Sequence, residues 1–96
     1  MKVKGEELKV IELGSVVISK AGRDKGRFLV IVRVDSEKVY VCDGKERPIG
    51  RPKPKNPIHL APTKTVLPEE ALQSNRSIKA GLHPFNYPKE HGEIDR

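Results

Sequence analysis

The sequence predicts a mainly β fold, a small β-barrel followed by one C-terminal helix and a flexible tail. Most of the Val, Ile and Leu residues of this 96-residue chain crowd into residues 8–41, in short runs separated by turns that contain Gly and Asp. A chain of this length forms one small domain with a modest core. Beyond the N-terminal lead, a helical pattern appears only from residue 67 onward, and the last residues are polar without periodicity.

Four segments follow along the chain. Residues 1–13 form a lead that fits either a short helix or an edge strand. Residues 14–62 form the barrel and include a basic, proline-rich segment. Residues 63–82 form a helical extension, and residues 83–96 form a tail that is expected to be disordered.

The strands of the barrel are predicted from short runs that alternate or are rich in β-branched and aromatic residues. The run RFLVIVRV is the central strand, and the pair Asp43-Gly44 is a strong hairpin signal that leads into a fourth strand. The strands are expected at residues 14–19, 27–34, 39–42, 46–49 and 58–61.

Two loops interrupt these strands. The loop KAGRDKG, residues 20–26, joins the first two strands and needs positive φ at one or more positions. The segment GRPKPKNP, residues 50–57, has three prolines and should run extended in a polyproline-like form. Further on, Pro68 and two glutamates begin a helix near residues 68–80, which Gly81 is expected to end.

The excess positive charge lies in one region. Residues 14–60 contain 11 Lys and Arg against 5 Asp and Glu, which accounts for the whole net charge of +6. A localised excess of this kind favours a polyanionic partner. Glycines and backbone N–H groups in the loop at 20–26 would let a phosphate approach while neighbouring cations neutralise it. The residues predicted to contact this polyanion are Lys20, Arg23, Lys25, Gly26, Arg27, Lys45, Arg47, Arg51, Lys53 and Lys55.

A family resemblance rests on AGRDKG followed by a strand, then VCDGKER, then PKPKNPIHLAP. With Gly26 as the characteristic glycine, this order resembles the KOW family of small SH3-like β-barrels. It is similar in particular to the large-subunit ribosomal protein family fourteen-e, over roughly residues 10–62. The resemblance implies a KOW-domain RNA-binding protein, ribosomal or ribosome-associated. Those ribosomal relatives continue with long basic helices, whereas this chain continues with a short neutral segment.

We therefore expect an RNA-binding protein of the translation apparatus, with structured RNA and the large ribosomal subunit as candidate partners. A protein-interaction module of SH3-like form and a DNA or transcription accessory factor are the alternatives. Aromatic residues are few, with Phe28 and Tyr40 expected in the core, so recognition should rely on phosphates and folded RNA shape instead of base stacking.

Other classes find no support in the sequence. There is no nucleophile with a base at motif spacing, no P-loop and no paired-carboxylate signature, so we expect no enzyme and no cofactor. His83 and His91 are too isolated to predict a metal site, and His59 should be a structural, hydrogen-bonded histidine. The absence of a long apolar run predicts no membrane segment and a cytoplasmic location. The single cysteine, Cys42, is expected to be buried.

Overall fold

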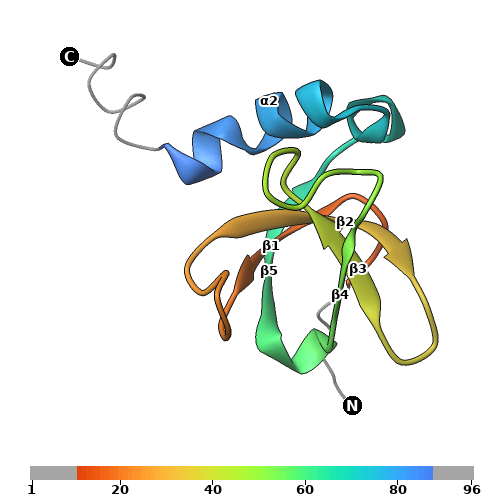
Figure 1. Cartoon of the computed structure of the whole chain (residues 1–96), viewed down its shortest axis with the longest axis vertical. Coiled ribbons are helices and arrows are strands. Elements are labelled where there is room, and N and C mark those ends of the chain that lie inside the picture. Colours follow the sequence, from red (N-terminus) through yellow and green to blue (C-terminus); the bar gives the residue numbers. More distant parts are fainter. Residues whose placement is uncertain (1–10, 88–96) are drawn as a thin grey trace.

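The computed structural model describes residues 11–87, so the predictions for residues 1–10 and 88–96 lie outside the described residues. Five antiparallel strands form one sheet in the order β4-β3-β2-β1-β5, and one α-helix lies over it (Figure 1). The strands are β1 (Ser15–Ser19), β2 (Phe28–Val34), β3 (Val39–Cys42), β4 (Lys53–Lys55) and β5 (Leu60–Val66). The helices are the 3₁₀ helices η1 (Pro57–His59) and η2 (Glu69–Leu72) and the α-helix α2 (Asn75–Asn86).

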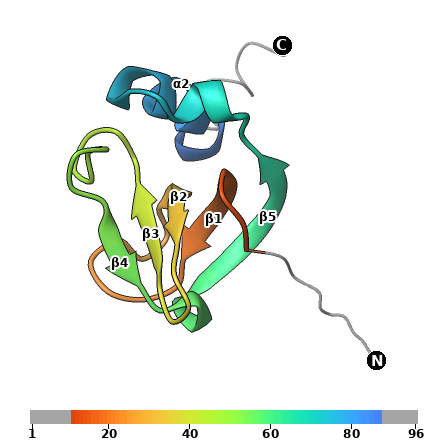
Figure 2. The same ribbon diagram turned by 90° about the vertical axis from the view of Figure 1, so that its right-hand side faces the viewer.

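The prediction of a mainly β fold with one C-terminal helix is confirmed. The strands β4 and β5 are the two edges of the sheet, so the sheet is not closed into a barrel. The two edges approach each other where η1 connects them (Figure 2). Within residues 11–87 no helix combines the length and the apolar character needed to cross a membrane.

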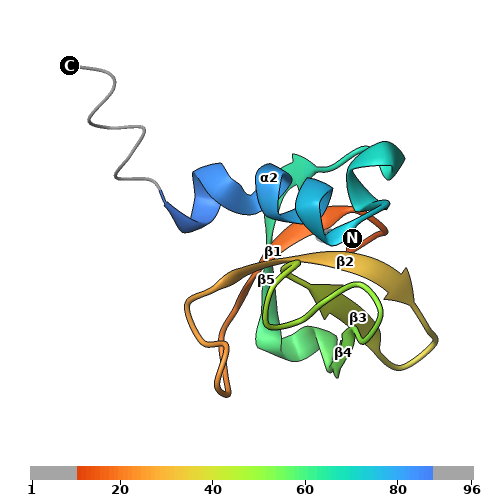
Figure 3. The same cartoon turned by 45° about the horizontal axis from the view of Figure 1, so that its top comes forward.

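Both faces of the sheet carry buried side chains, and successive side chains of a strand point to opposite faces. One face carries a cluster to which Val17 and Ile31 belong, and the other carries Val16 and Val30. The helix α2 covers the second face (Figure 3) and adds Ile78 and Leu82, which are at most 1% exposed, to its cluster. Burial on both sides explains why the central strand reads as a continuous apolar run.

The predicted fourth strand at residues 46–49 is wrong. The backbone there turns back, and the carbonyl of Arg47 accepts from the N–H groups of Asp43 and Gly44. The strand forms instead in the proline-rich segment, where Pro54 lies opposite Tyr40 of β3. Since an edge strand is hydrogen-bonded on one side only, it tolerates a residue that has no N–H to donate. The predicted polyproline-like segment is therefore partly an edge strand.

The C-terminal helix differs from the prediction in its bounds. Residues 63–66 continue β5, residues 69–72 are a 3₁₀ turn, and α2 begins after Ser74, which forms a capping box with Ser77. Gly81 does not end the helix. A Cβ at Gly81 would lie 2.8 Å from a methyl of Leu67, so the glycine allows Leu67 to pack closely against the helix. Residues 83–86, predicted to be disordered, form the last turn of α2.

The helix is an integral part of the fold, because polar contacts hold it at both ends. Near its start, Oδ1 of Asn75 accepts from the N–H of Ile49 at 2.7 Å. At its end, the Asn86 amide pairs with the backbone of Phe28, accepting from its N–H at 3.0 Å and donating to its carbonyl at 3.3 Å. Gly44 provides the space for the helix, since a Cβ there would collide with the Asn75 carbonyl.

Candidate nucleic-acid interface

The loop between β1 and β2 has the predicted turn geometry. Gly22 and Gly26 adopt φ of 80° and 86°, which confirms the expectation of positive φ. The N–H groups of Lys25, Gly26 and Arg27, however, donate to carbonyls inside the loop or to β1, at 2.8–3.1 Å. These three N–H groups are already satisfied, so a phosphate at this loop would be met by side chains instead of by them.

A buried carboxylate, Asp24, lies at the base of this loop. Its side chain is only 5% exposed, and its Oδ2 lies 3.4 Å from Nη2 of Arg47. The ammonium groups of Lys53 and Lys55 lie 3.9 Å from the same oxygen. Asp24 therefore ties the β1–β2 loop to the segment after β3 and to the edge strand β4.

The side chain of Lys55 serves this same junction. It is 8% exposed and donates to Oγ of Ser19 at 2.9 Å and to the carbonyl of Ala21 at 3.2 Å. Its ammonium group is thus surrounded by protein acceptors. Of the predicted RNA-binding residues, Lys55 has the most deeply buried charged group, and its contacts stabilise the β1–β2 loop.

A second buried carboxylate, Asp43, organises the segment after β3. Its Oδ1 accepts from the N–H groups of Lys45 and Arg47, both at 2.8 Å, and its Oδ2 accepts from Nη2 of Arg27 at 3.0 Å. Arg27 also reaches Glu46 at 3.3 Å. The side chain of Asp43 is 4% exposed, so its two oxygens are enclosed by the groups that they bind. Asp43 thereby fixes the position of Arg27 beside this turn.

The predicted cations fall into two groups, according to whether their charged groups pair with an acidic side chain. Arg27, Arg47, Lys53 and Lys55 form ion pairs with Asp24, Asp43 or Glu46. The remaining five are exposed, and none of them forms an ion pair within residues 11–87. We call these five the basic rim: Lys20, Arg23, Lys25, Lys45 and Arg51.

A hollow of about 400 Å³ lies within this region and is lined by Arg23, Asp24, Glu46 and Arg47. Two of its four lining residues are acidic, which disfavours a phosphate inside it. The exposed cations of the basic rim are better placed to contact an anion.

Several further predictions can be compared with the structure. Cys42 is fully buried, as expected, and its Sγ donates to the carbonyl of Pro48 at 3.6 Å. Burial, and secondarily the charge of Asp43, raises the pKa of the Cys42 thiol to about 11, so the thiol is protonated and unreactive at neutral pH. Tyr40 is half-buried beneath the guanidinium of Arg33. His59, predicted to be a structural, hydrogen-bonded histidine, is exposed.

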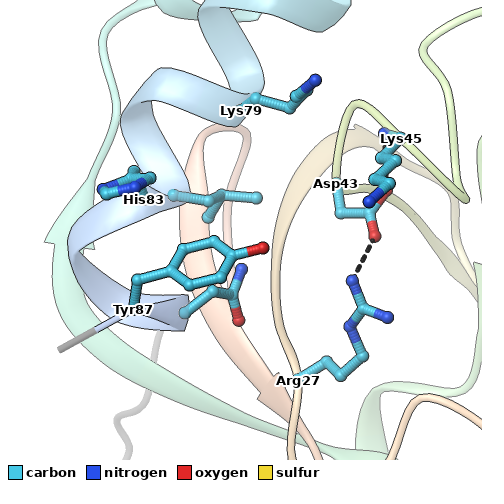
Figure 4. A pocket seen from close by; sticks show the side chains of 8 residues that line it. Arg27, Asp43, Lys45, Lys79, His83 and Tyr87 are labelled. Atoms are coloured by element: carbon cyan, nitrogen blue, oxygen red, sulfur yellow. Dashed lines mark hydrogen bonds and ion pairs between the residues drawn. The ribbon is translucent and has the colours of Figure 1, made fainter. Parts of the chain in front are cut away.

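A pocket that the sequence did not predict lies between α2 and the turn after β3 (Figure 4). Its volume is about 310 Å³, and we call it the helix pocket. The sequence predicts a disordered tail over residues 83–87 and so gives no pocket here. The aromatic residues Phe85 and Tyr87 were the signal that could have identified it. It is lined by Arg27, Asp43, Lys45, Lys79, Leu82, His83, Asn86 and Tyr87.

Comparison with the models of known protein families finds no match, and no curated protein matches the chain.

Proposed function

We propose that this chain is an RNA-binding protein that contacts the phosphates of structured RNA through the basic rim. One observation carries the proposal: five exposed cations without ion pairs in the described chain stand on loops that two buried carboxylates, Asp24 and Asp43, fix to one another. Exposed cations attract phosphates, and fixed loops reduce the entropy lost on binding.

The proposal includes a family and a cellular setting. The strand, glycine loop and strand around Gly26 support a KOW-type, SH3-like domain in which the sheet remains open between β4 and β5. The motif order that resembles ribosomal protein family fourteen-e favours RNA over DNA and points to the ribosome, in particular the large subunit, as the place of action. The concentration of charge favours a nucleic acid over a protein partner.

The proposal is tested by the salt dependence of binding to an RNA hairpin. If all five rim cations contact phosphates, the logarithm of the binding constant falls with the logarithm of salt concentration with a slope of about −4 to −5. Replacing Lys20 and Lys25 by Gln should weaken binding and reduce the slope by about two. Fluorescence anisotropy at several salt concentrations measures both quantities.

A matched control removes the same charge elsewhere. Lys38 lies in the β2–β3 turn and Lys64 in β5, both exposed and away from the rim loops. The Lys38→Gln, Lys64→Gln variant should keep the slope of the wild type. Equal losses in both double variants would refute the rim as the RNA site, and equal affinity for a DNA duplex of the same length would favour the DNA alternative.

Association with the ribosome needs its own measurement. The wild type should co-sediment with the large subunit at moderate salt, and the Lys20, Lys25 variant should not. If salt-independent binding to a protein is found in place of RNA binding, the protein-interaction alternative replaces the proposal.

A further inference from the structure

The helix pocket combines charge with an aromatic surface. Lys79 of α2 and Lys45 of the turn after β3 both line the pocket, one on each side of it (Figure 4). Both are exposed, and neither forms an ion pair among the described residues. Arg27 is the third cation, but its guanidinium is bound to Asp43 and Glu46. The pocket therefore has two cations available for an anion.

The aromatic surface comes from the end of the helix. Tyr87 is 50% exposed, and its ring extends across the pocket with the hydroxyl toward the interior. The ring packs against that of His83, with centroids 4.8 Å apart and an angle of 31° between the planes. Leu82, 1% exposed, adds a fixed apolar side chain to the lining. This ring is half-buried on a fixed support, and its open part can stack on a planar ligand.

The hydrogen-bonding groups of the pocket limit which bases it can distinguish. Both oxygens of Asp43 accept hydrogen bonds from the protein, and the amide of Asn86 is engaged with the backbone of Phe28 through both of its polar atoms. These two residues are therefore occupied and do not select the edge of a base. Among the groups that remain are the ring face and hydroxyl of Tyr87 and two ammonium groups, which suit any base with its phosphate.

We propose that the helix pocket binds one unpaired nucleotide of the RNA, with its base stacked on Tyr87 and its phosphates between Lys45 and Lys79. The volume of about 310 Å³ is at the lower end of the range for small-ligand sites, which suits one nucleotide and not several. The inference rests on the proposed function. It deepens that function, because a protein with this pocket prefers RNA that has a bulged or single-stranded nucleotide over a fully paired helix.

The experiment uses the full chain and three RNA hairpins with the same stem. One hairpin is fully paired, one has a single bulged adenosine, and one has an abasic nucleotide at the bulge, which keeps the backbone and lacks the base. The wild type should bind the adenosine bulge about 5- to 100-fold more tightly than the abasic bulge. Tyr87→Phe should keep this preference and Tyr87→Leu should lose it.

A spectroscopic readout locates the effect in the pocket. The chain has two tyrosines and no tryptophan, so in a Tyr40→Phe background the emission comes from Tyr87 alone. The bulged adenosine should quench this emission, and the abasic bulge should leave it nearly unchanged. Because Tyr87 is half exposed at the end of α2, Tyr87→Leu should unfold at the temperature of the wild type, which a melting curve checks.

The outcomes separate the two proposals. Salt-dependent binding of all three hairpins with equal affinity overturns the nucleotide pocket and leaves the rim proposal standing, and so does a preference for the adenosine that survives in Tyr87→Leu. If the wild type binds none of the hairpins, both proposals fail.

Discussion

Replacing Asp24 by Asn tests whether this carboxylate holds the rim loops together. The substitution keeps the shape of the side chain and removes its charge, while Arg47, Lys53 and Lys55 stay in place around it. We expect the free energy of unfolding to fall by about 3 kcal/mol.

The magnitude follows from the three contacts. The Arg47 contact at 3.4 Å is a charge-assisted hydrogen bond to an enclosed carboxylate, a class that contributes about 1.5–3 kcal/mol. The two ammonium groups at 3.9 Å are ionic contacts without hydrogen bonds. The side chain of Lys53 is 35% exposed, so its contact contributes at most about 1 kcal/mol. Lys55 is enclosed, but it keeps its bonds to Ser19 and Ala21 in the variant and so loses only part of its stabilisation.

Urea unfolding followed by circular dichroism measures the effect. With a slope of about 1.5 kcal/mol per molar urea, a loss of 3 kcal/mol lowers the midpoint by about 2 M. Asp35→Asn is the matched control, because Asp35 pairs with Arg33 at 3.6 Å on the surface and its side chain is 42% exposed. A change of less than about 0.5 kcal/mol for Asp24→Asn, or equal effects in the two variants, would refute the assignment of Asp24 as the brace of the rim.

Three further predictions concern the packing of α2 and the buried thiol. Gly44→Ala should lower the free energy of unfolding by about 3 kcal/mol, because the new Cβ combines a strained positive φ with a collision against Asn75. Gly26→Ala has the same backbone strain but no neighbouring atom to collide with, so it should lower the free energy of unfolding by about 1 kcal/mol. Asn86→Ala should cost about 2 kcal/mol, because it leaves the strand backbone unpaired. The pKa of the Cys42 thiol is 9.0 in the unfolded chain and about 11 in the fold. The buried neutral thiol therefore contributes its full stabilisation below pH 9, and the free energy of unfolding falls by about 2–3 kcal/mol as the pH rises to 11.

Urea titrations check all three, at pH 7 for the two helix contacts and from pH 8 to 11 for the thiol. Equal losses in the free energy of unfolding for Gly44→Ala and Gly26→Ala would mean that α2 does not pack tightly against the turn at Gly44. An unchanged stability in Asn86→Ala would show that the strand end is solvated. Cys42→Ala is the control for the thiol, and if its stability falls between pH 9 and 11 as steeply as that of the wild type, other groups cause the alkaline loss.

The sequence allowed the strands to be predicted where side-chain pattern decides the conformation. The runs of β1, β2 and β3 are rich in β-branched residues and lie between polar or glycine-containing turns, so local chemistry and tertiary packing agree there. The strand β4 could not be predicted in this way. A Lys-Pro-Lys sequence has little strand propensity, and it becomes a strand because it lies at an edge beside Tyr40 while its lysines reach Asp24.

The site was predictable in composition and not in arrangement. Charge and loop chemistry predict ten candidate residues, but sequence spacing does not show that Asp24 lies close to cations that are 23 to 31 residues away from it. The helix pocket escaped prediction for a similar reason. Its aromatic ring follows a glycine and a proline that normally signal the end of a helix, and here packing against Leu67 and the bonds of Asn86 override those signals.

The pairing between Asn86 and Phe28 also has a consequence for biosynthesis. The two residues are 58 positions apart, and at about 5–20 residues per second the ribosome needs roughly 3 to 12 seconds to make the chain between them. In the last part of this interval, after β5 is made, the face of the sheet that carries Val16 and Val30 has no helix to cover it. Nascent chains are therefore most exposed to aggregation and to chaperones after β5 is made and before α2 is complete.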